Sequence, residues 1–203
     1  MSPEKVLVLS CGALAKEVLD VVARNRIEHI KVEFLPASLH NNPSLIPDAV
    51  EERLSRGDYD RALVGYGDCG TAGSLDAVLE KFGVERLPGS HCYEFFTTSD
   101  VFATIHEDDP RTFYLTDFLV RHFERLVWVG LGLDRHPELM EEYFRNYERV
   151  VYLSQFPSAE TLTDARRCAD KLKLRFEHRH VGLGALEATI VALPSLTVAK
   201  AGV

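Results

Sequence analysis

The chain has 203 residues, of which 46% are hydrophobic and 27% charged, and its formal net charge at pH 7 is −8. This composition is typical of an ordinary globular protein and excludes disordered, collagen-like and coiled-coil chains. The negative charge repels a phosphate backbone, and neither a zinc-finger spacing nor a basic stripe occurs, so we expect no nucleic-acid partner. No apolar run approaches the roughly 18 residues of a membrane span and no signal peptide is evident, so we expect no membrane partner and a cytoplasmic location.

The first half of the chain repeats a strand, loop and helix pattern. Short β-branched and leucine-rich runs predict strands, and apolar residues at helical spacing follow each of them. Strands are predicted at 6–9, 29–35 and 61–66, and helices at 14–22, 46–54 and 75–82. Because each parallel crossover needs a connection of helix length, this order predicts a parallel sheet with helices on its faces.

The second half is less regular in the middle and clearer at its end. The predicted elements are a short strand at 84–87, helices at 114–128 and about 137–144, a strand at 150–154, a helix capped by Ser158 and running to 172, a strand beginning at 174–176, and a helix at 183–193. No linker of distinct composition divides the chain. We therefore predict one doubly wound α/β domain over residues 1–203, with a mainly parallel sheet and helices on both faces.

Soft metal-ligating side chains follow the first strands of the predicted sheet. Cys11, His40, Cys69 and Cys92 each lie in a loop after one of them. The carboxyl ends of parallel strands meet at one edge of a sheet, and ligands bind at that edge. The sequence therefore predicts that these side chains share a site.

Three thiols and an imidazole are suited to zinc or an iron–sulfur cluster and unsuited to magnesium or calcium. We expect helix N-termini to lower the thiol pKa values and favour the metal-binding thiolate. His91 is a substitute for His40 as the fourth ligand. The alternative is that each cysteine is a small core residue, since free cysteine is among the most buried residue types. Cys168, on a predicted helix, is interpreted as structural or as a surface residue.

Glycines accompany two of these cysteines. Gly12 and Gly70 would let the backbone approach a bulky ligand, and the G-x-x-G-x-x-G spacing of residues 67–73 would allow backbone amides to hold a phosphate or carboxylate. A tight turn is the alternative for residues 67–73, because the spacing matches neither the dinucleotide fingerprint nor a Walker loop.

Two further sets of polar residues have open interpretations. The first is a set of candidate general acids and bases that also suit helix capping: Tyr114, Asp117, Asp134 and His136. The second is either a solvated edge or a site for a carboxylate or phosphate: Arg175, His178, Arg179 and His180.

Several motifs together resemble the DUF1638 family. They are Ser10-Cys11-Gly12-Ala13-Leu14, Leu35-Pro36-Ala37-Ser38-Leu39-His40-Asn41, Tyr66-Gly67-Asp68-Cys69-Gly70-Thr71, Leu87-Pro88-Gly89-Ser90-His91-Cys92-Tyr93, Thr112-Phe113-Tyr114-Leu115-Thr116-Asp117 and Val150-Val151-Tyr152-Leu153. The resemblance implies a cytosolic protein that occurs beside corrinoid-dependent methyltransferase systems of methylated amines, and so a setting in one-carbon metabolism. It supplies no catalytic residues.

The first functional hypothesis is a metal-centre protein, an enzyme or an accessory factor, in which Cys11, Cys69 and Cys92 with His40 hold zinc or a [4Fe-4S] cluster. Its partner would be a small-molecule substrate or a corrinoid or methyltransferase protein. The alternative is a module that binds a small anion or a partner, with structural cysteines and no metal. A third hypothesis is covalent catalysis by Cys69 activated by His91 or His40. The sequence leaves open the substrate, the metal, the oligomeric state and whether the protein is catalytic.

Overall fold

The computed structural model describes residues 4–193. The described residues divide into two compact units, one formed by residues 4–95 and 184–193 and the other by residues 96–183. In this part of the chain all strand pairs are parallel, and the strands form two sheets, of four and three strands. The α/β class and the parallel strands are confirmed, whereas the single sheet expected over residues 1–203 is corrected to one sheet in each unit.

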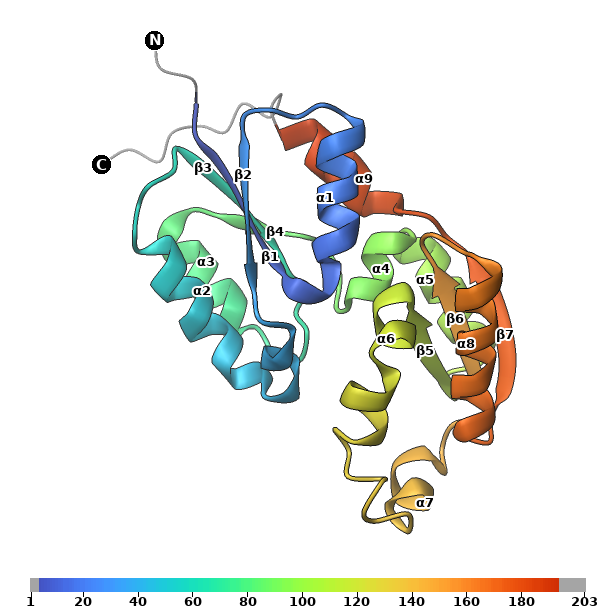
Figure 1. The fold of residues 1–203 in the computed structure, drawn as a ribbon. Helices are drawn as coiled ribbons and strands as arrows, with labels where there is room; N and C mark the ends of the chain where they lie inside the picture. The colour runs from blue at the N-terminus through green and yellow to red at the C-terminus, as the bar shows by residue number, and fades with distance from the viewer. Residues whose placement is uncertain (1–3, 194–203) are drawn as a thin grey trace. The chain divides into compact units, whose positions relative to one another are not determined.

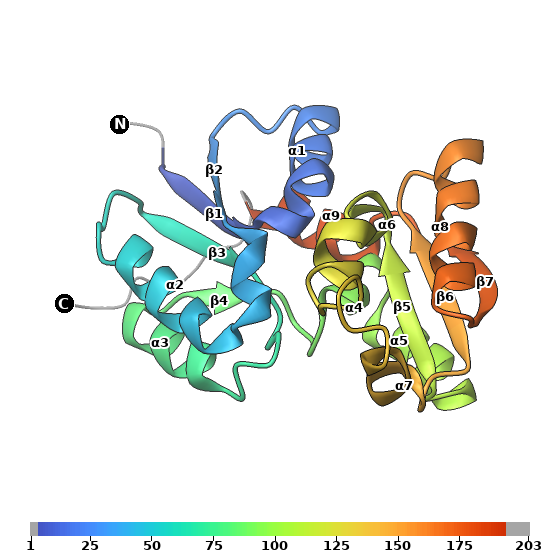
Figure 2. The ribbon, with the colours of Figure 1, turned by 60° about the horizontal axis from the view of Figure 1, so that its bottom comes forward.

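The first unit has a four-stranded sheet in the order β2-β1-β3-β4. Its strands are β1 (Val6–Cys11), β2 (Ile30–Leu35), β3 (Arg61–Gly65) and β4 (Glu85–Arg86), and its helices are α1 (Ala15–Arg24), α2 (Ile46–Leu54), α3 (Ser74–Phe82) and α9 (Gly184–Ala192). Helix α1 packs with α9 and α2 packs with α3, and the two pairs cover opposite faces of the sheet (Figures 1 and 2). This unit is therefore doubly wound.

The central strand β1 is buried along its whole length. Helices cover both faces, so its sequence Val-Leu-Val-Leu-Ser-Cys lacks the polar alternation of a half-exposed strand. The core around it comprises Leu7, Leu9, Cys11, Ile46, Val50, Leu54, Val64, Tyr66, Leu75, Val78 and Leu79. Cys11 thus closes the apolar strand at the edge where the loops begin.

Gly65, the last residue of β3, lies directly beside Ser10 of β1. A Cβ atom at position 65 would lie 2.3 Å from the Ser10 Oγ and 2.7 Å from its Cβ. We expect Gly65→Ala to lower the free energy of unfolding by about 1–3 kcal/mol, the usual cost of overpacking a core. Urea denaturation would measure this loss, and adding Ser10→Gly should recover part of it because the clashing side chain is gone. Losses that simply add in the double variant would contradict this account.

The second unit has a three-stranded sheet in the order β5-β6-β7. Its strands are β5 (Thr112–Thr116), β6 (Arg149–Ser154) and β7 (Arg175–His180), and its helices are α5 (Ser99–Asp108), α6 (Asp117–Arg121), a π-helical turn (Glu124–Trp128), α7 (Leu139–Phe144) and α8 (Ala159–Lys171). The short helix α4 (Cys92–Phe96) ends where this unit begins. Ser158 caps α8 as predicted, and Thr161 completes a capping box.

The predicted helix at 114–128 is wrong at its start. Residues 112–116 form the strand β5, and Thr116 caps α6 by accepting from the Leu119 backbone N–H. The segment Thr-Phe-Tyr-Leu-Thr is β-branched and aromatic, which favours a strand, while the helical spacing of apolar residues begins only after Thr116. The apolar residue at 115 fits both patterns, which extended the predicted helix too far.

Within residues 4–193, none of the helices is both long and apolar enough to span a bilayer.

Candidate functional site

The carboxyl edge of the first sheet contains a topological switch point between β1 and β3. The chain leaves β1 towards β2 on one side and leaves β3 towards β4 on the other. Since such crossovers are right-handed, the helices that follow the two strands cover opposite faces and their loops diverge. Ligands of open α/β sheets bind at this position. Cys11 is the last residue of β1, and Cys69 lies in the loop after β3.

Cys11 and His40 form the best-defined contact at this edge. The Cys11 Sγ lies 3.5 Å from the His40 Nδ1, and the Ala13 backbone N–H donates to the same sulfur. Cys11 is positioned as the N-cap of a three-residue 3₁₀ helix (Gly12–Leu14), and His40 lies in the 3₁₀ helix Ala37–Asn41 that follows β2. The structure thus brings Cys11 and His40 together at this edge.

Tyr66 packs against the Cys11 and His40 pair on the side of the core. Its ring stacks on the His40 imidazole, with centroids 5.9 Å apart and planes inclined by 12°, and the residue is 1% exposed. Burial raises the Tyr66 pKa, and the Cys11 thiol raises it further. Tyr66 thus fixes the plane of the imidazole and closes the site on the side of the core. This role could not be predicted from the sequence, because an aromatic residue at the end of a strand is usually part of the core.

Cys69 and Cys92 lie near enough to Cys11 for the thiol charges to influence one another's pKa values. The charge of a Cys69 thiolate raises the Cys92 pKa, and that of a Cys11 thiolate raises the pKa values of both Cys69 and Cys92. Cys69 has a left-handed backbone (φ +50°), and its N–H donates to the Ser90 carbonyl at 2.9 Å. The loops after β3 and β4 are therefore tied together, and each carries a thiol. No group of three or more His, Cys, Asp or Glu side chains among the described residues is arranged to hold a metal ion.

The expected lowering of the thiol pKa values is wrong for this structure. Burial is the largest influence on Cys11, Cys69 and Cys92, and it raises all three values, that of Cys69 to about 11. At Cys11 this influence outweighs the hydrogen bond from the Ala13 backbone N–H, which lowers the pKa. Burial also lowers the His40 pKa. At neutral pH the Cys11 and His40 pair is therefore a neutral thiol beside a neutral imidazole.

The glycine-rich loop at 67–73 is a tight turn closed by its own carboxylate. Asp68 accepts hydrogen bonds from the backbone N–H groups of Gly70, Ala72 and Gly73 and from the Thr71 hydroxyl. The amide of Gly70, expected to face a ligand, is thus already used. The alternative of a tight turn is the better interpretation, and the signal for it was the aspartate within the glycine spacing.

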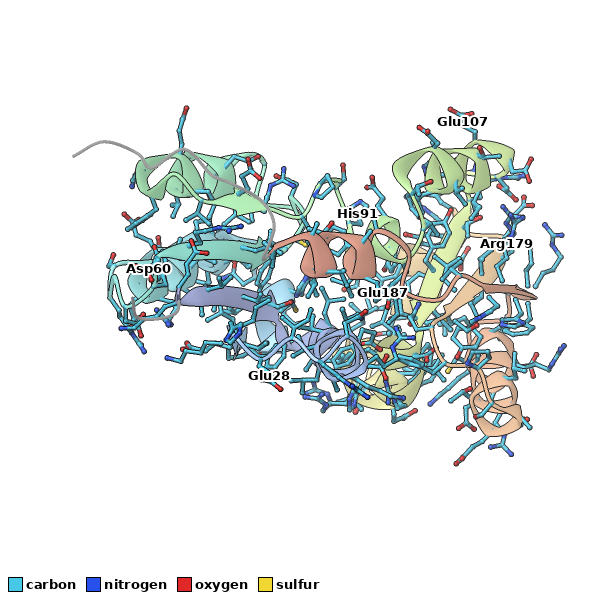
Figure 3. The ribbon with its side chains drawn as sticks, turned by 90° about the horizontal axis from the view of Figure 1, so that it is seen from above. Glu28, Asp60, His91, Glu107, Arg179 and Glu187 are labelled. Atoms are coloured by element: carbon cyan, nitrogen blue, oxygen red, sulfur yellow. The ribbon has the colours of Figure 1, made fainter. Side chains whose placement is uncertain are left out.

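Gly12 also has a packing reason. A Cβ atom there would lie 3.0 Å from the Leu35 carbonyl oxygen and 3.3 Å from the Ala37 backbone nitrogen. The end of β2 therefore approaches the backbone at Gly12 closely, which accounts for a glycine without a cofactor. His91, the expected substitute ligand, is exposed (labelled in Figure 3). Its ring centroid lies 6.0 Å from that of Tyr93.

Glu17 is a functional candidate that the sequence reasoning missed. It lies on α1, is 1% exposed, and its charge raises the Cys92 pKa. The available signal was its position, since residues 14, 17, 18 and 21 form one helical face and the other three are apolar and buried. A carboxylate at such a position faces the protein interior.

The remaining candidates lie in the second unit. Cys168 is buried in the core cluster beneath α8, as predicted for a structural cysteine. Tyr114 lies in β5, and Asp117 begins α6. Asp134 and His136 are exposed, and the His136 Nδ1 lies 3.2 Å from the Glu138 carboxylate.

Together these features define an α/β protein whose first unit is doubly wound and carries a thiol and imidazole pair at its switch point. A family model described as "Protein of unknown function (DUF1638)" matches residues 34–190, and the chain belongs to this family. The matched segment contains His40, Cys69 and Cys92 and begins after Cys11. No curated protein matches the chain significantly.

Proposed function

We propose that the carboxyl edge of the first sheet binds a soft transition-metal ion, with Cys11 and His40 as the first two ligands and Cys69 and Cys92 as further donors. The observation that carries this proposal is the 3.5 Å separation of the Cys11 Sγ and the His40 Nδ1. Tetrahedral zinc with Zn–S and Zn–N bonds of about 2.3 and 2.0–2.1 Å places a sulfur and a nitrogen ligand about 3.5 Å apart. The pair thus has the spacing of two zinc ligands before any metal binds.

The donor set suits zinc better than a [4Fe-4S] cluster. A cluster holds each cysteine sulfur on a different iron atom, whereas the Cys11 and His40 donors have the spacing of ligands on one ion. Cys69 or Cys92 would supply a third ligand by side-chain rotation, because a Cys11 thiolate is near enough to both to raise their pKa values, although the three do not form a ready-made three-ligand group. Glu17 would balance positive charge beside Cys92.

This site would serve thiol or methyl chemistry. With three of these four donors bound, a tetrahedral zinc ion keeps one open position, where it would lower the pKa of a bound thiol or water and so supply a nucleophile. Such a nucleophile is what methyl transfer in a corrinoid-dependent system requires, and the family resemblance suggests that setting. The chain's own residues would orient the donors: Tyr66 holds the His40 ring, and the Ala13 N–H directs the Cys11 sulfur.

Elemental analysis of anaerobically purified protein tests the proposal. After dialysis against metal-free buffer has removed weakly bound ions, we expect about one equivalent of zinc in the wild type and less than about half an equivalent in Cys11→Ala and His40→Gln. Cys168→Ala and His136→Gln are matched controls that should retain the metal. Bound iron together with the absorbance of an iron–sulfur cluster would show that the site holds a cluster in place of zinc. A metal content that is the same in the wild type and in the Cys11 and His40 variants would contradict the proposed site.

A second candidate function uses the same contact without a metal. His40 is a neutral base 3.5 Å from the Cys11 thiol, a distance at which it would accept the thiol proton as the sulfur attacks a substrate. The structure thus favours Cys11 over Cys69 for covalent catalysis. If this function holds, Cys11 reacts with iodoacetamide in metal-free protein and His40→Gln slows the reaction, whereas an accessory module with structural cysteines would show neither effect.

A further inference from the structure

The carboxyl edge of the second sheet carries two histidines that converge on one serine. The His178 Nε2 lies 2.9 Å from the Ser154 Oγ, and the His180 Nδ1 lies 3.3 Å from the same oxygen and 3.2 Å from the Ser154 carbonyl oxygen. The register between β6 and β7 pairs Tyr152 with His178 and Ser154 with His180. Since alternate residues of a strand share a face, both imidazoles lie on the same face of the sheet.

Neighbouring groups hold this arrangement in place. The His178 ring lies 5.4 Å from the Tyr152 ring, and the Tyr152 hydroxyl donates to the buried Asp117 carboxylate at 2.7 Å. Ser154 is 0% exposed, whereas both histidines are exposed. The two exposed imidazoles are thus positioned by the protein beside a serine oxygen that is not itself at the surface.

The cluster does not suit nucleophilic catalysis by the serine. Ser154 is buried, and the next two backbone N–H groups, those of Gln155 and Phe156, donate to the Asp117 carboxylate. These amides are therefore not free to stabilise an oxyanion, which acyl transfer requires.

An anion site is also disfavoured. The two arginines of β7 contact carboxylates: the Arg179 Nε lies 2.7 Å from Glu177, and the Arg175 guanidinium lies 3.9 Å from Asp109 (Arg179 is labelled in Figure 3). The pleat directs odd-numbered residues to the face opposite the histidines. The basic cluster seen in the sequence thus separates into paired arginines and two histidines that share one serine.

We propose that His178 and His180 chelate a divalent transition-metal ion of the class that prefers imidazole nitrogen, namely Ni²⁺, Cu²⁺ or Zn²⁺, with the oxygen atoms of Ser154 beside it. Metal–imidazole bonds are about 2.0–2.1 Å long, so two nitrogens that already flank one oxygen need only small ring rotations to share an ion. Burial lowers the His178 pKa, which favours the neutral imidazole that binds metal ions. Two imidazoles leave other coordination positions to water, and the affinity should rise from Zn²⁺ or Ni²⁺ to Cu²⁺. This site is independent of the thiols of the first unit.

Calorimetric titration of the full chain with Ni²⁺ tests the proposal. We expect saturable binding in the wild type and at least about tenfold weaker binding in His178→Gln/His180→Gln, because the ligands are gone. His106→Gln/His136→Gln replaces two other exposed histidines of the same unit and should bind as the wild type does. Cys11→Ser should also bind Ni²⁺ here, which separates this site from the thiol site.

Paramagnetic broadening provides a measurement that needs no variant. In the wild type, substoichiometric Ni²⁺ should broaden the amide NMR signals of residues 178–180 and 154 before others. Three results would overturn the proposal. They are Ni²⁺ affinity that is unchanged in His178→Gln/His180→Gln, an equal loss of affinity in the control variant, and NMR broadening confined to the first unit.

Discussion

Asp117→Ala is expected to lower the free energy of unfolding by about 3–5 kcal/mol, the cost of removing one partner from a buried charged network. The Asp117 carboxylate is 1% exposed and accepts hydrogen bonds from the Tyr152 hydroxyl at 2.7 Å and from the backbone N–H groups of Gln155 and Phe156 at 3.1 and 2.8 Å. Alanine would leave all three donors buried without an acceptor, at about 1–3 kcal/mol each before the structure relaxes. Urea denaturation at pH 7 measures the loss.

Two control variants locate the cause. Tyr152→Phe removes one of the three donors and should cost about 1–2 kcal/mol. Asp134→Ala removes an exposed aspartate of the same unit and should change stability by less than about 0.5 kcal/mol. If Asp117→Ala were no more harmful than Asp134→Ala, the carboxylate would not be joining β5 to β6.

Arg53→Met should destabilise the first unit by about 2–3 kcal/mol. The Arg53 side chain is 5% exposed, and its Nε and Nη2 donate to the Glu33 carboxylate at 2.5 and 2.8 Å while its Nη1 donates to Asp58 at 2.8 Å. Breaking a fully buried pair costs about 3–5 kcal/mol, but Glu33 is 27% exposed, so water recovers part of the loss. Methionine keeps the apolar stem, so the variant isolates the charge. Arg56→Met, at an exposed residue just after α2, should have little effect.

The loss should depend on pH in a defined direction. Hydrogen bonds from Arg53, and then from Lys31, lower the Glu33 pKa from 4.5 to about 2. A carboxylate whose pKa is lowered by folding stabilises the native state above its unfolded pKa, and this contribution disappears as the pH falls through the folded value. The difference between wild type and Arg53→Met should therefore be full at pH 6 and shrink between about pH 4.5 and pH 2. A difference that stays constant over this range would contradict the role of Glu33.

The sequence predicts the regular elements of the first unit well. The helix predicted at 46–54 matches α2, and the strands predicted at 6–9 and 61–66 lie within two residues of β1 and β3. Apolar periodicity determines these elements because each packs against a continuous core. The division into two sheets was not predictable in this way, since which strands pair depends on contacts distant in the sequence. The end of the first sheet at β4, which has only two residues, has no local signal.

The candidate site was predictable in position and less so in chemistry. Parallel topology alone brings Cys11 and His40 to one edge, because each follows a strand of the same sheet. Burial, which raises the pKa of Cys11, is a property of the packed structure and opposes the helix-terminus effect expected from the sequence. The turn closed by Asp68 and the support from Tyr66 likewise depend on side-chain contacts.

Two hydrogen bonds join the loops after β3 and β4: the Asp68 N–H donates to the Gly89 carbonyl, and the Cys69 N–H donates to the Ser90 carbonyl. These bonds couple the motions of the two loops. Local opening of either loop exposes both amides to solvent exchange together. A ligand bound to Cys69 would accordingly reduce the local backbone motion of the loop that carries Cys92, without contacting that loop. Binding at one thiol would thus preorganise the position of the other.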